Sequence, residues 1–520
     1  MQANPRPPSR PPSGNAFRIV ILGGGTAGWM CAAGLVRLLD PADYSITLIE
    51  SDEIGTVGVG EATLPHIKTF NDMLGLDEAE FLRDTRGSIK LGIEFVGWTR
   101  PDDRYIHPFG TFGEPWAGVD FQHSWARARL AGRDVGSLQD YSYAIALALA
   151  NGFEPPSEDM SSIRSTYSYA YHFDAGLYAA FLRNWATARG VERVEGQVMD
   201  VGRDAGSGHV ETLTLKSGET IAGDLFIDCS GFRSLLVGQT MGVDWCDWSQ
   251  WLPCDRALAV PCERVAPLTP YTRATAQRGG WIWRIPLQHR TGNGYVFSSS
   301  FCEEDAAHAT LMAAIDGPAL AEPRLLRFQA GRRARAWEGN CVAVGLAGGF
   351  LEPLESTSIF LIQAAVTDLA NLIPTRATGI DPRLAAEFNR LFEIHYDRAR
   401  DFVVLHYATN ARAGEPLWDH VRAMTLPDSL AHKIALFEES AAAPEYQLGL
   451  FSRDSWFSVL EGQRVLPRAY NRLADRIPLD ALEARLNDLR ARIAASATGR
   501  TSHAAFLANY CGEVELERVR

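Results

Sequence analysis

A single lysine occupies an unusual place in an otherwise apolar segment of the chain. In GSIKLGIEF, Ile89, Leu91 and Ile93 alternate with Lys90 and Gly92, so on a strand the lysine faces away from the apolar side chains. If the face that carries Lys90 lines an internal site, burial will lower the pKa of its amine. The same spacing also fits a solvated lysine at a strand edge. From the spacing alone the exposed position is the favoured interpretation, and a buried Lys90 with a catalytic role is the alternative.

A second group of polar residues stands directly before an apolar helical pattern, in LEPLESTSIFLI. Glu355 precedes Ser356, Thr357 and Ser358, where a carboxylate could complement a helix N-terminus and a hydroxyl could cap it. Exposed N–H groups at a helix start also stabilise a bound anion, so Thr357 and Ser358 are candidates for an anion site. Glu355 is the second candidate catalytic residue. Glu352 lies close by and ranks lower.

A glycine motif near the start of the chain predicts a dinucleotide-binding unit. The apolar run of residues 17–22 has strand length, and it is followed by GGGTAG and a helical pattern. Gly23, Gly25 and Gly28 satisfy GxGxxG, which permits a tight turn, close approach of a pyrophosphate and close packing of the helix on the strand. Glu50 ends the next strand, where an acid bonds a ribose hydroxyl. The alternative is a glycine-rich turn without a ligand.

Further turns belong to the same predicted cofactor site. They are the loop GVGEAT, the end of a strand at DCSG, and a strand, glycine turn and helix that return at residues 340–373. The candidate cofactor-binding residues are Gly23, Gly25, Thr26, Ala27, Gly28, Glu50, Gly58, Val59, Gly60, Glu61, Ala62, Thr63, Asp228, Gly231, Gly345, Leu346 and Gly349.

Two tryptophans lie downstream of this unit, at positions 281 and 283 of GGWIWRIP. Beside a flavin ring, the indole side chains of Trp281 and Trp283 would fill the space that an organic substrate needs. Only something small, such as a halide ion, would then fit there.

Composition limits the other classes of function. The 520 residues carry a formal net charge of -13, which disfavours nucleic acid or an anionic membrane as a partner. Neither a signal peptide nor a membrane span is indicated, and the eight cysteines form no CxxC pair, so we expect a cytoplasmic protein without a metal site. A homodimer is compatible with the sequence.

The order of the patterns predicts an α/β protein with three parts. Residues 1–16, rich in proline and serine, are expected to form a disordered tail, residues 17–380 a discontinuous nucleotide-binding domain with substrate-side insertions, and residues 381–520 a mainly helical cap. A helix is predicted over residues 174–189. Its expected apolar face carries Leu177, Ala180, Phe181 and Trp185.

Four motifs in this order, GGGTAGW, GVGEAT with KLGIEF, WIWRIP and FLEPLESTSI, resemble the flavin-dependent tryptophan halogenase family. The resemblance covers nearly the whole chain after the tail. It implies an FAD-binding Rossmann-type domain of the flavin monooxygenase kind, with an inserted antiparallel sheet and a C-terminal helical subdomain. It also implies that a separate flavin reductase supplies reduced FAD (FADH2), which with oxygen converts chloride or bromide to hypohalous acid.

The resemblance gives roles to the polar residues. Lys90 matches the lysine that receives hypohalous acid and presents the halogen to the substrate, as a haloamine or through a hydrogen bond. Glu355 matches the carboxylate that polarises the halogen donor or accepts the ring proton. Thr357 and Ser358 match the halide site. Trp281, Trp283 and Ser356 match residues that shield the flavin side or link it to the substrate side.

The resemblance specifies the substrate less well. His107 and Phe109, in YIHPFGTFG, match residues that sandwich an indole ring, and Trp456 is a third candidate. Glu445 and Tyr446 lie in a shortened loop where relatives grip the amino-acid part of tryptophan, so we expect a free or substituted indole and leave tryptophan open. A flavin-dependent hydroxylase and a non-catalytic flavin-binding protein are the alternative functions.

Overall fold

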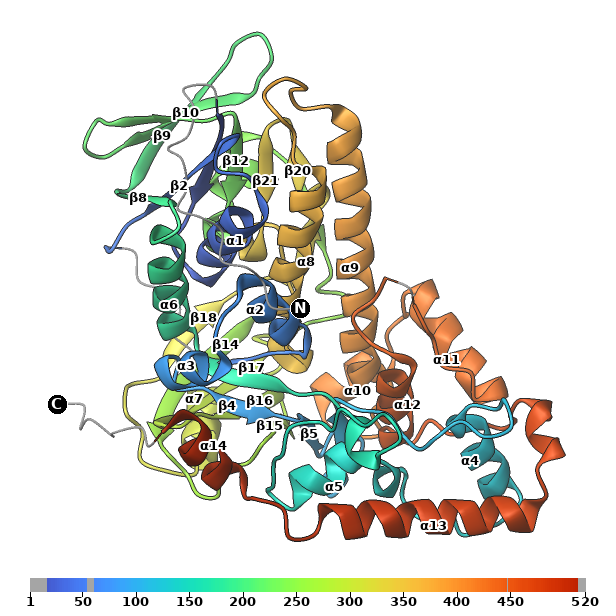
Figure 1. The fold of residues 1–520 in the computed structure, drawn as a ribbon. Helices are drawn as coiled ribbons and strands as arrows, with labels where there is room; N and C mark the ends of the chain where they lie inside the picture. Colours follow the sequence, from blue (N-terminus) through green and yellow to red (C-terminus); the bar gives the residue numbers. More distant parts are fainter. Residues whose placement is uncertain (1–15, 54–59, 447, 513–520) are drawn as a thin grey trace.

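The computed structural model describes residues 16–53, 60–446 and 448–512. Two bodies meet at an angle, and the long helix α9 runs from one into the other (Figure 1). The expected tail lies outside the described residues except for Ala16, whose carbonyl accepts a hydrogen bond from Arg376. The candidate cofactor residues Gly58 and Val59 also lie outside them.

The upper body in Figure 1 is built on a six-stranded sheet whose order is β20-β21-β12-β1-β2-β8. All neighbouring strands are parallel except the edge pair β20 and β21. The strands are β1 (Phe17–Leu22), β2 (Tyr44–Glu50), β8 (Glu192–Glu195), β12 (Leu225–Asp228), β20 (Trp337–Glu338) and β21 (Cys341–Ala343). The carboxyl ends of β1, β2, β12 and β21 therefore meet at one edge, as expected for a nucleotide site.

Helices cover one face of this sheet and a small sheet covers the other. The helices are α1 (Thr26–Leu38), α6 (Ala175–Thr187) and α8 (Thr357–Leu372). The small sheet contains β9 (Val198–Arg203), β10 (Val210–Leu215) and β11 (Thr220–Ala222). Alternate residues of β1 explain the two layers, because Ile19 and Ile21 join the helix side of the core while Val20 and Leu22 pack with β9 and β10.

Helix α6 lies where the sequence predicts a helix, although its buried face is different. Asp174 caps it by accepting hydrogen bonds from the N–H groups of Gly176 and Leu177. The buried residues are Ala175, Tyr178, Ala179, Leu182 and Ala186, whereas Leu177 is 37% exposed. The aromatic contact of Tyr178 with Phe81 orients the helix, and local spacing does not reveal that partner.

The lower body contains a seven-stranded sheet of order β18-β14-β17-β16-β15-β5-β6. It is antiparallel except for the parallel pair of β15 and β5, which confirms the expected inserted sheet. Its strands are β5 (Gly92–Val96), β6 (Arg104–Pro108), β14 (Arg256–Glu263), β15 (Thr272–Gln277), β16 (Gly280–Pro286), β17 (Arg290–Phe297) and β18 (Arg324–Arg327). Strand β16 carries both tryptophans and is buried along its whole length.

A three-stranded sheet joins the two bodies and contains the candidate lysine. Its order is β3-β7-β4, and its strands are β3 (Gly60–Ala62), β4 (Ser88–Lys90) and β7 (Ala170–Asp174). The strand predicted around Lys90 is therefore broken at Leu91, which donates its N–H to Pro270 instead of continuing the ladder. Both faces are buried from Ser88 to Phe95, so the exposed position for Lys90 is wrong.

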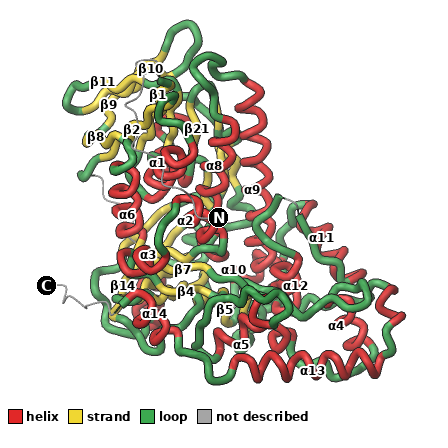
Figure 2. The backbone as a smooth tube through the Cα atoms, in the orientation of Figure 1, coloured by secondary structure: helices red, strands yellow, loops and turns green. Residues whose placement is uncertain are grey.

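The C-terminal part is helical, as predicted, and Figure 2 shows its helices on one side and along the base of the lower body. Helix α9 (Pro382–Ala408) packs on α8 and β20 as well as on α10, α11 and α12, so it belongs to both bodies. The other helices there are α10 (Pro416–Arg422), α11 (Asp428–Ser440), α12 (Arg453–Gly462), α13 (Leu479–Ala497) and α14 (His503–Cys511). No helix among the described residues is both long and apolar enough to cross a membrane.

The remaining elements fill the connections. They are α2 (His66–Leu74), α3 (Glu78–Asp84), α4 (Phe121–Leu130), α5 (Tyr143–Leu149), α7 (Glu304–Ala314), β13 (Trp245–Asp247), β19 (Gly331–Arg333) and β22 (Gly349–Phe350).

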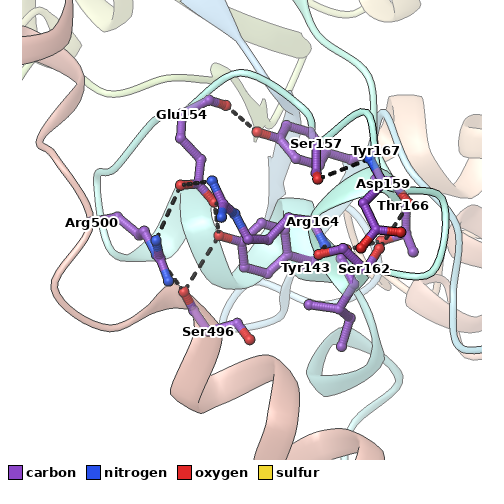
Figure 3. A network of polar contacts seen from close by, with 12 residues as sticks. Tyr143, Glu154, Ser157, Asp159, Ser162, Arg164, Thr166, Tyr167, Ser496 and Arg500 are labelled. Carbon is purple, nitrogen blue, oxygen red and sulfur yellow. Dashed lines mark hydrogen bonds and ion pairs between the residues drawn. The ribbon is translucent and has the colours of Figure 1, made fainter.

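A polar network attaches the end of α13 to the substrate-side insertion (Figure 3). The carboxylate of Glu154 accepts hydrogen bonds from Tyr143 at 2.6 Å, from Arg164 at 2.6 and 2.8 Å, and from Arg500 at 3.2 Å. Its backbone carbonyl accepts one from Tyr167. Because Tyr167 bridges to Gly110, this network supports the loop that follows Phe109.

Candidate active site

Lys90 lies at the end of β4 with its amine enclosed by the protein. Its side chain is 0% exposed, and Nζ donates to the backbone carbonyl of Thr63 at 2.9 Å and to Oγ of Ser356 at 2.8 Å. The ring of Phe109 lies 5.0 Å from Nζ. Burial lowers the pKa of Lys90 to about 7, although nearby Glu355 raises it. The amine therefore changes its protonation state near neutral pH.

Ser356 holds its hydroxyl toward Lys90 through an uncommon backbone conformation. Its φ of 58° lies in the left-handed region, which costs a non-glycine residue on the order of 1 kcal/mol or more. The residue sits between a short turn, Pro353–Glu355, and the first residue of α8, Thr357. This turn places Glu355, Ser356 and Thr357 in three different directions. The conformation is a local signature of a functional site.

Glu355 is fully buried between two histidines. Its carboxylate lies 2.9 Å from Nδ1 of His107 and 2.9 Å from Nε2 of His406. Burial alone would raise the pKa of this carboxyl, but His107 and His406 lower it to about 2. Glu355 is therefore ionised over the whole physiological range, and it faces two side chains rather than acting as a simple complement to the start of α8.

His406 is a residue that the sequence does not single out. It lies in the last turn of α9, where the pattern predicts only a helix, and its Nδ1 contacts the carbonyl of Phe402 at 2.8 Å. His406 lies far from His107 in the sequence, so no short motif contains both residues. Only the packing of α9 against β5 and β6, for example Phe95 against His406 at 4.7 Å, places it at Glu355.

The candidate substrate residues surround the same point. His107 and Phe109 are edge-on at 6.3 Å, and the ring of His107 lies 5.5 Å from that of Phe402. Phe402 in turn contacts Trp456 at 5.0 Å and stacks on Phe451 at 3.7 Å. The structure thus brings His107, Phe109 and Trp456 together with Lys90 and Glu355, and it adds Phe402 and Phe451, which the sequence analysis missed.

The two clamp candidates have different surroundings. The side chain of Glu445 is 74% exposed and its nearest cation is Arg453 at 3.8 Å. Tyr446 stacks beneath the guanidinium of Arg398 at 4.0 Å.

Several buried polar atoms around this point lack a hydrogen-bond partner within the described part of the chain. Buried polar atoms are normally paired, so such a concentration indicates contacts with a ligand or water. The atoms are Nε2 of His107, Oγ1 of Thr357 and Nε1 of Trp456. The hydroxyl of Thr357 lies at the start of α8, whose N-cap residue makes no side-chain cap. This is a physically suitable place for an anion.

Trp281 and Trp283 lie on β16 between the two halves of the site. Their rings are 6.3 Å apart, and Trp281 also lies 6.2 Å from Trp98. Farther along β16, a Cβ at Gly60 would lie 3.4 Å from Ile285, so the tryptophan strand packs directly on the cofactor loop. The pair is therefore placed between that loop and α9.

Glu352 is buried beside Trp281. Burial raises its pKa to about 7, and the donors of Tyr407, Trp281 and Cys254 lie beside it and lower it. It is 1% exposed, so its neutral form is populated near pH 7.

The glycine motif has the geometry that a dinucleotide requires. A Cβ at Gly28 would lie 1.8 Å from the carbonyl oxygen of Gly23, and Gly23 itself has a φ of 116°. By contrast, no atom lies within 4 Å of the position that a Cβ would take at Gly25, the N-cap of α1, which has no side-chain cap. Free N–H groups and open space thus coincide where a pyrophosphate would bind.

The other candidate cofactor residues lie around this turn. A Cβ at Gly345 would lie 2.8 Å from Ala27, so the two glycine turns, far apart in sequence, are adjacent. Glu50 is held by Nε1 of Trp29 at 3.1 Å and by Arg193 at 2.5 Å. A carboxylate has about four acceptor positions, so room remains for a ribose hydroxyl.

Asp228 has a different contact pattern from the other candidates. Its buried carboxylate accepts hydrogen bonds from the N–H groups of Leu236 at 2.8 Å and Val237 at 2.9 Å, and from the hydroxyl and N–H of Ser230. Asp228 therefore stabilises the turn that presents Gly231. Direct contact of its carboxylate with a cofactor remains a prediction.

Thr63 and the backbone around it connect the cofactor loop to Lys90. The chain passes from Gly60, Glu61 and Ala62 in β3 to Thr63, whose carbonyl accepts the hydrogen bond from Lys90. Thr63 is anchored in turn to the carbonyl of Tyr171 by its N–H and its hydroxyl. A shift of the cofactor loop would therefore displace an acceptor of the lysine.

The strand that carries Lys90 is supported from the end of the chain. The N–H of Ile89 donates to Nε2 of His503, on α14, at 3.0 Å, and Nδ1 of the same ring donates to the carbonyl of Leu268 at 2.9 Å. Burial lowers the pKa of His503 to about 4, so the neutral ring that this pair of hydrogen bonds needs is maintained.

No group of His, Cys, Asp or Glu among the described residues is arranged to hold a metal ion. The polar arrangement instead fits a nucleotide cradle, an anion position at Thr357, and an aromatic enclosure that contains an amine and a carboxylate.

Known proteins are similar to this chain over most of their length. The family model described as tryptophan halogenase matches residues 18–479. A tryptophan 6-halogenase from Streptomyces toxytricini is 38% identical over 445 residues, which is 81% of this chain and 83% of that protein.

Two solved structures of flavin-dependent halogenases are also similar. The one from Brevundimonas sp. BAL3 has a TM-score of 0.91 and 41% identity, and covers 95% of this chain and 99% of its own. The one from Xanthomonas campestris has a TM-score of 0.91 and 45% identity, and the match covers 96% of this chain and 99% of that protein. The chain therefore belongs to the tryptophan halogenase family and is a flavin-dependent halogenase.

Proposed function

We propose that this chain halogenates an uncharged indole or a substituted indole, with chloride or bromide as the halogen source and with reduced FAD from a separate reductase. The observation that carries the proposal is the fully buried amine of Lys90, which has a pKa of about 7 and lies beside Phe109 and near the ionised Glu355. An amine in this position can hold an electrophile that a solvated lysine would lose to water.

FAD, when bound, supplies the activated oxygen that oxidises the halide to hypohalous acid. The turn from Gly23 to Gly28 would hold its pyrophosphate and Glu50 its ribose. Thr357, with its unpartnered hydroxyl and the free amides at the start of α8, would bind the halide. Trp281 and Trp283 would exclude the organic substrate from the flavin side, so that hypohalous acid reaches Lys90 before it meets the aromatic ring.

Lys90 is arranged to act as a neutral amine. Its two N–H groups can donate to Thr63 and Ser356, which leaves the lone pair at a third tetrahedral position. Reaction of this amine with hypohalous acid forms an N–halogen bond and releases water. Transfer of the halogen to the ring breaks the nitrogen–halogen bond and forms a carbon–halogen bond. The ring then loses one proton and the nitrogen takes up one proton, and this exchange restores the amine.

Glu355 is suited to the second part of this sequence. The carboxylate is ionised, with a pKa of about 2, and it is buried, so it stabilises the cationic ring intermediate strongly and can accept the departing proton. His107 and His406 hold both of its oxygens and fix their direction. The position of the ring between His107, Phe109 and Trp456 then determines which carbon receives the halogen.

Comparison of indole with tryptophan tests the substrate. Because Glu445 is exposed and Tyr446 is covered by Arg398, we expect no grip on an amino-acid ammonium group, and indole should react at least as efficiently as tryptophan, at the electron-rich pyrrole carbon. The assay contains flavin reductase, FAD, NADH and bromide, and reads brominated product by isotope pattern. A clear preference for tryptophan with reaction on the benzo ring would refute this proposal. Hydroxylated product formed without halide would favour a hydroxylase instead.

A further inference from the structure

One cation beside the aromatic enclosure has no counter-ion. The side chain of Arg398 on α9 makes no ion pair or hydrogen bond with any residue that the structure describes, and its Nη1 is buried without a partner. The other cations nearby are paired, because Arg400 on α9 pairs with Asp401 at 2.8 Å and Lys433 on α11 pairs with the same carboxylate at 2.6 Å. A buried, unpaired N–H of a guanidinium is unfavourable unless a ligand completes it.

Arg398 lies on the same stripe of α9 as the residues that form the site. Positions 398, 402 and 406 are four residues apart and so share one face of the helix. His406 contacts Glu355, and Phe402 forms the aromatic wall against His107 and Trp456. With a rise of about 1.5 Å per residue, Arg398 lies roughly 12 Å along the axis from His406, the length of a bicyclic ring with a short side chain.

The loop that covers the ring position also covers this arginine. Phe451 stacks on Phe402 at 3.7 Å, while Tyr446, from the same loop, lies under the guanidinium of Arg398 at 4.0 Å. Stacking on Tyr446 holds the guanidinium plane and leaves its edge, with the N–H donors, for a ligand. Lys433, which is paired with Asp401, also lies 5.5 Å from the Tyr446 ring, so two cationic side chains border this ring and only that of Arg398 is unpaired.

We infer that Arg398 binds a carboxylate on the side chain of the aromatic substrate, and that the substrate class of this enzyme includes indoles with an anionic arm and no ammonium group. This inference rests on the proposed function and narrows it. Guanidinium and carboxylate form paired charge-assisted hydrogen bonds, the strongest kind available at such a position. The ammonium group of tryptophan would be repelled by the guanidinium of Arg398. The nearby carboxylate of Asp401 could not compensate, because it is already paired with Arg400 and Lys433.

The test compares two probes of the same shape, indole-3-propionate and its neutral amide, by calorimetric titration of the full-length, flavin-free enzyme. We expect the carboxylate to bind on the order of 10-fold more tightly, because hydrogen bonds between charged groups are stronger than neutral ones. Arg398→Gln should remove this preference and leave binding of the amide unchanged. Arg390→Gln is the matched control, since Arg390 lies on the same helix but is 54% exposed and pairs with Glu387.

Equal affinity of the wild-type enzyme for the two probes would overturn the inference without any variant. A preference that survives in Arg398→Gln, or that disappears equally in Arg390→Gln, would overturn it as well. Bromination of neutral indole by the wild-type enzyme is measured in parallel. It tests the proposed function alone, because it does not involve a carboxylate.

Discussion

The buried amine of Lys90 makes halogen transfer depend on pH in a way that separates two mechanisms. Burial, the larger influence, moves its pKa from 10.5 to about 7 against the opposing charge of Glu355. Relative to a solvated lysine, this pKa difference disfavours the ammonium form by on the order of 5 kcal/mol. The neutral fraction of the amine should therefore rise from about one tenth at pH 6 to about nine tenths at pH 8.

If the neutral amine takes the halogen, product formation must follow this fraction. We expect the yield of brominated indole per flavin oxidised to rise roughly ninefold between pH 6 and pH 8, with a midpoint near pH 7. Single-turnover experiments with pre-reduced flavin measure this yield without the reductase. Repeating them with chloride provides the control, because the acidity of the hypohalous acid depends on the halogen and that of Lys90 does not.

Two results would refute this reasoning. A yield that falls as pH rises would mean that the charged lysine acts as a hydrogen-bond donor, and a midpoint that moves with the halogen would assign the titration to the oxidant. Two variants test the same step. Lys90→Arg, which has no neutral form near pH 7, should lose halogenation, and Lys90→Ala should lose it while reduced flavin is still consumed and hypohalous acid is released. Halogenation by Lys90→Ala at the wild-type rate would remove this residue from the mechanism.

Three further perturbations follow from the same geometry. Glu355→Gln should lower turnover on the order of 100-fold with little change in FAD affinity, measured by steady-state kinetics and flavin titration, and a variant that mainly loses FAD would restore the helix-start interpretation. Gly25→Ala should fold normally but lose FAD binding. Gly28→Ala should be unstable even without FAD, because its Cβ would lie 1.8 Å from the carbonyl oxygen of Gly23. Equal melting temperatures of the two variants would contradict this expectation. Glu352 has its pKa raised in the folded state, from 4.5 to about 7, so its stabilising contribution is present at low pH and is lost as pH rises through 7. The unfolding free energy of Glu352→Gln, relative to that of the wild type, should therefore be on the order of 3 kcal/mol higher at pH 8 than at pH 5. Denaturant titrations of both proteins at the two pH values measure this difference.

The cofactor half of the fold could be predicted because its signals are local. Gly23, Gly25 and Gly28 lie within six residues, and their spacing alone specifies a turn followed by a helix that packs on the strand. The adjacency of Gly345 to Ala27 follows from the recurrence of strand, turn and helix in one sheet. In such segments the chemistry of each position is determined by its immediate neighbours.

The substrate half could be predicted only where a short motif contained the residue. The sequence analysis named Lys90, Glu355, His107 and Trp456 as candidates. It did not name His406, which contacts Glu355 at 2.9 Å. Periodicity identifies α9 as a helix but cannot reveal which partner a given face meets.

The same limit explains the wrong expectations about individual side chains. Leu177 was expected on the buried face of α6, and Lys90 could have been solvated. Both outcomes depend on segments that are distant in sequence. Phe81 packs against Tyr178, and the contacts of Lys90 come from Thr63, 27 positions away, and from Ser356, 266 positions away. Contacts over such separations are not encoded in a local pattern.

The hydrogen bond from Ile89 to His503 has a consequence for how this enzyme is made. The two residues are 414 positions apart, so during synthesis the short strand that carries Lys90 has no partner on that side until nearly the whole chain has left the ribosome. Closing so long a segment is among the slow events of folding. The cofactor domain, whose first strand and helix are adjacent in sequence, can assemble much earlier. A newly made molecule should therefore be able to hold flavin before its lysine is in place, and a chain shortened before His503 would remain in that immature state.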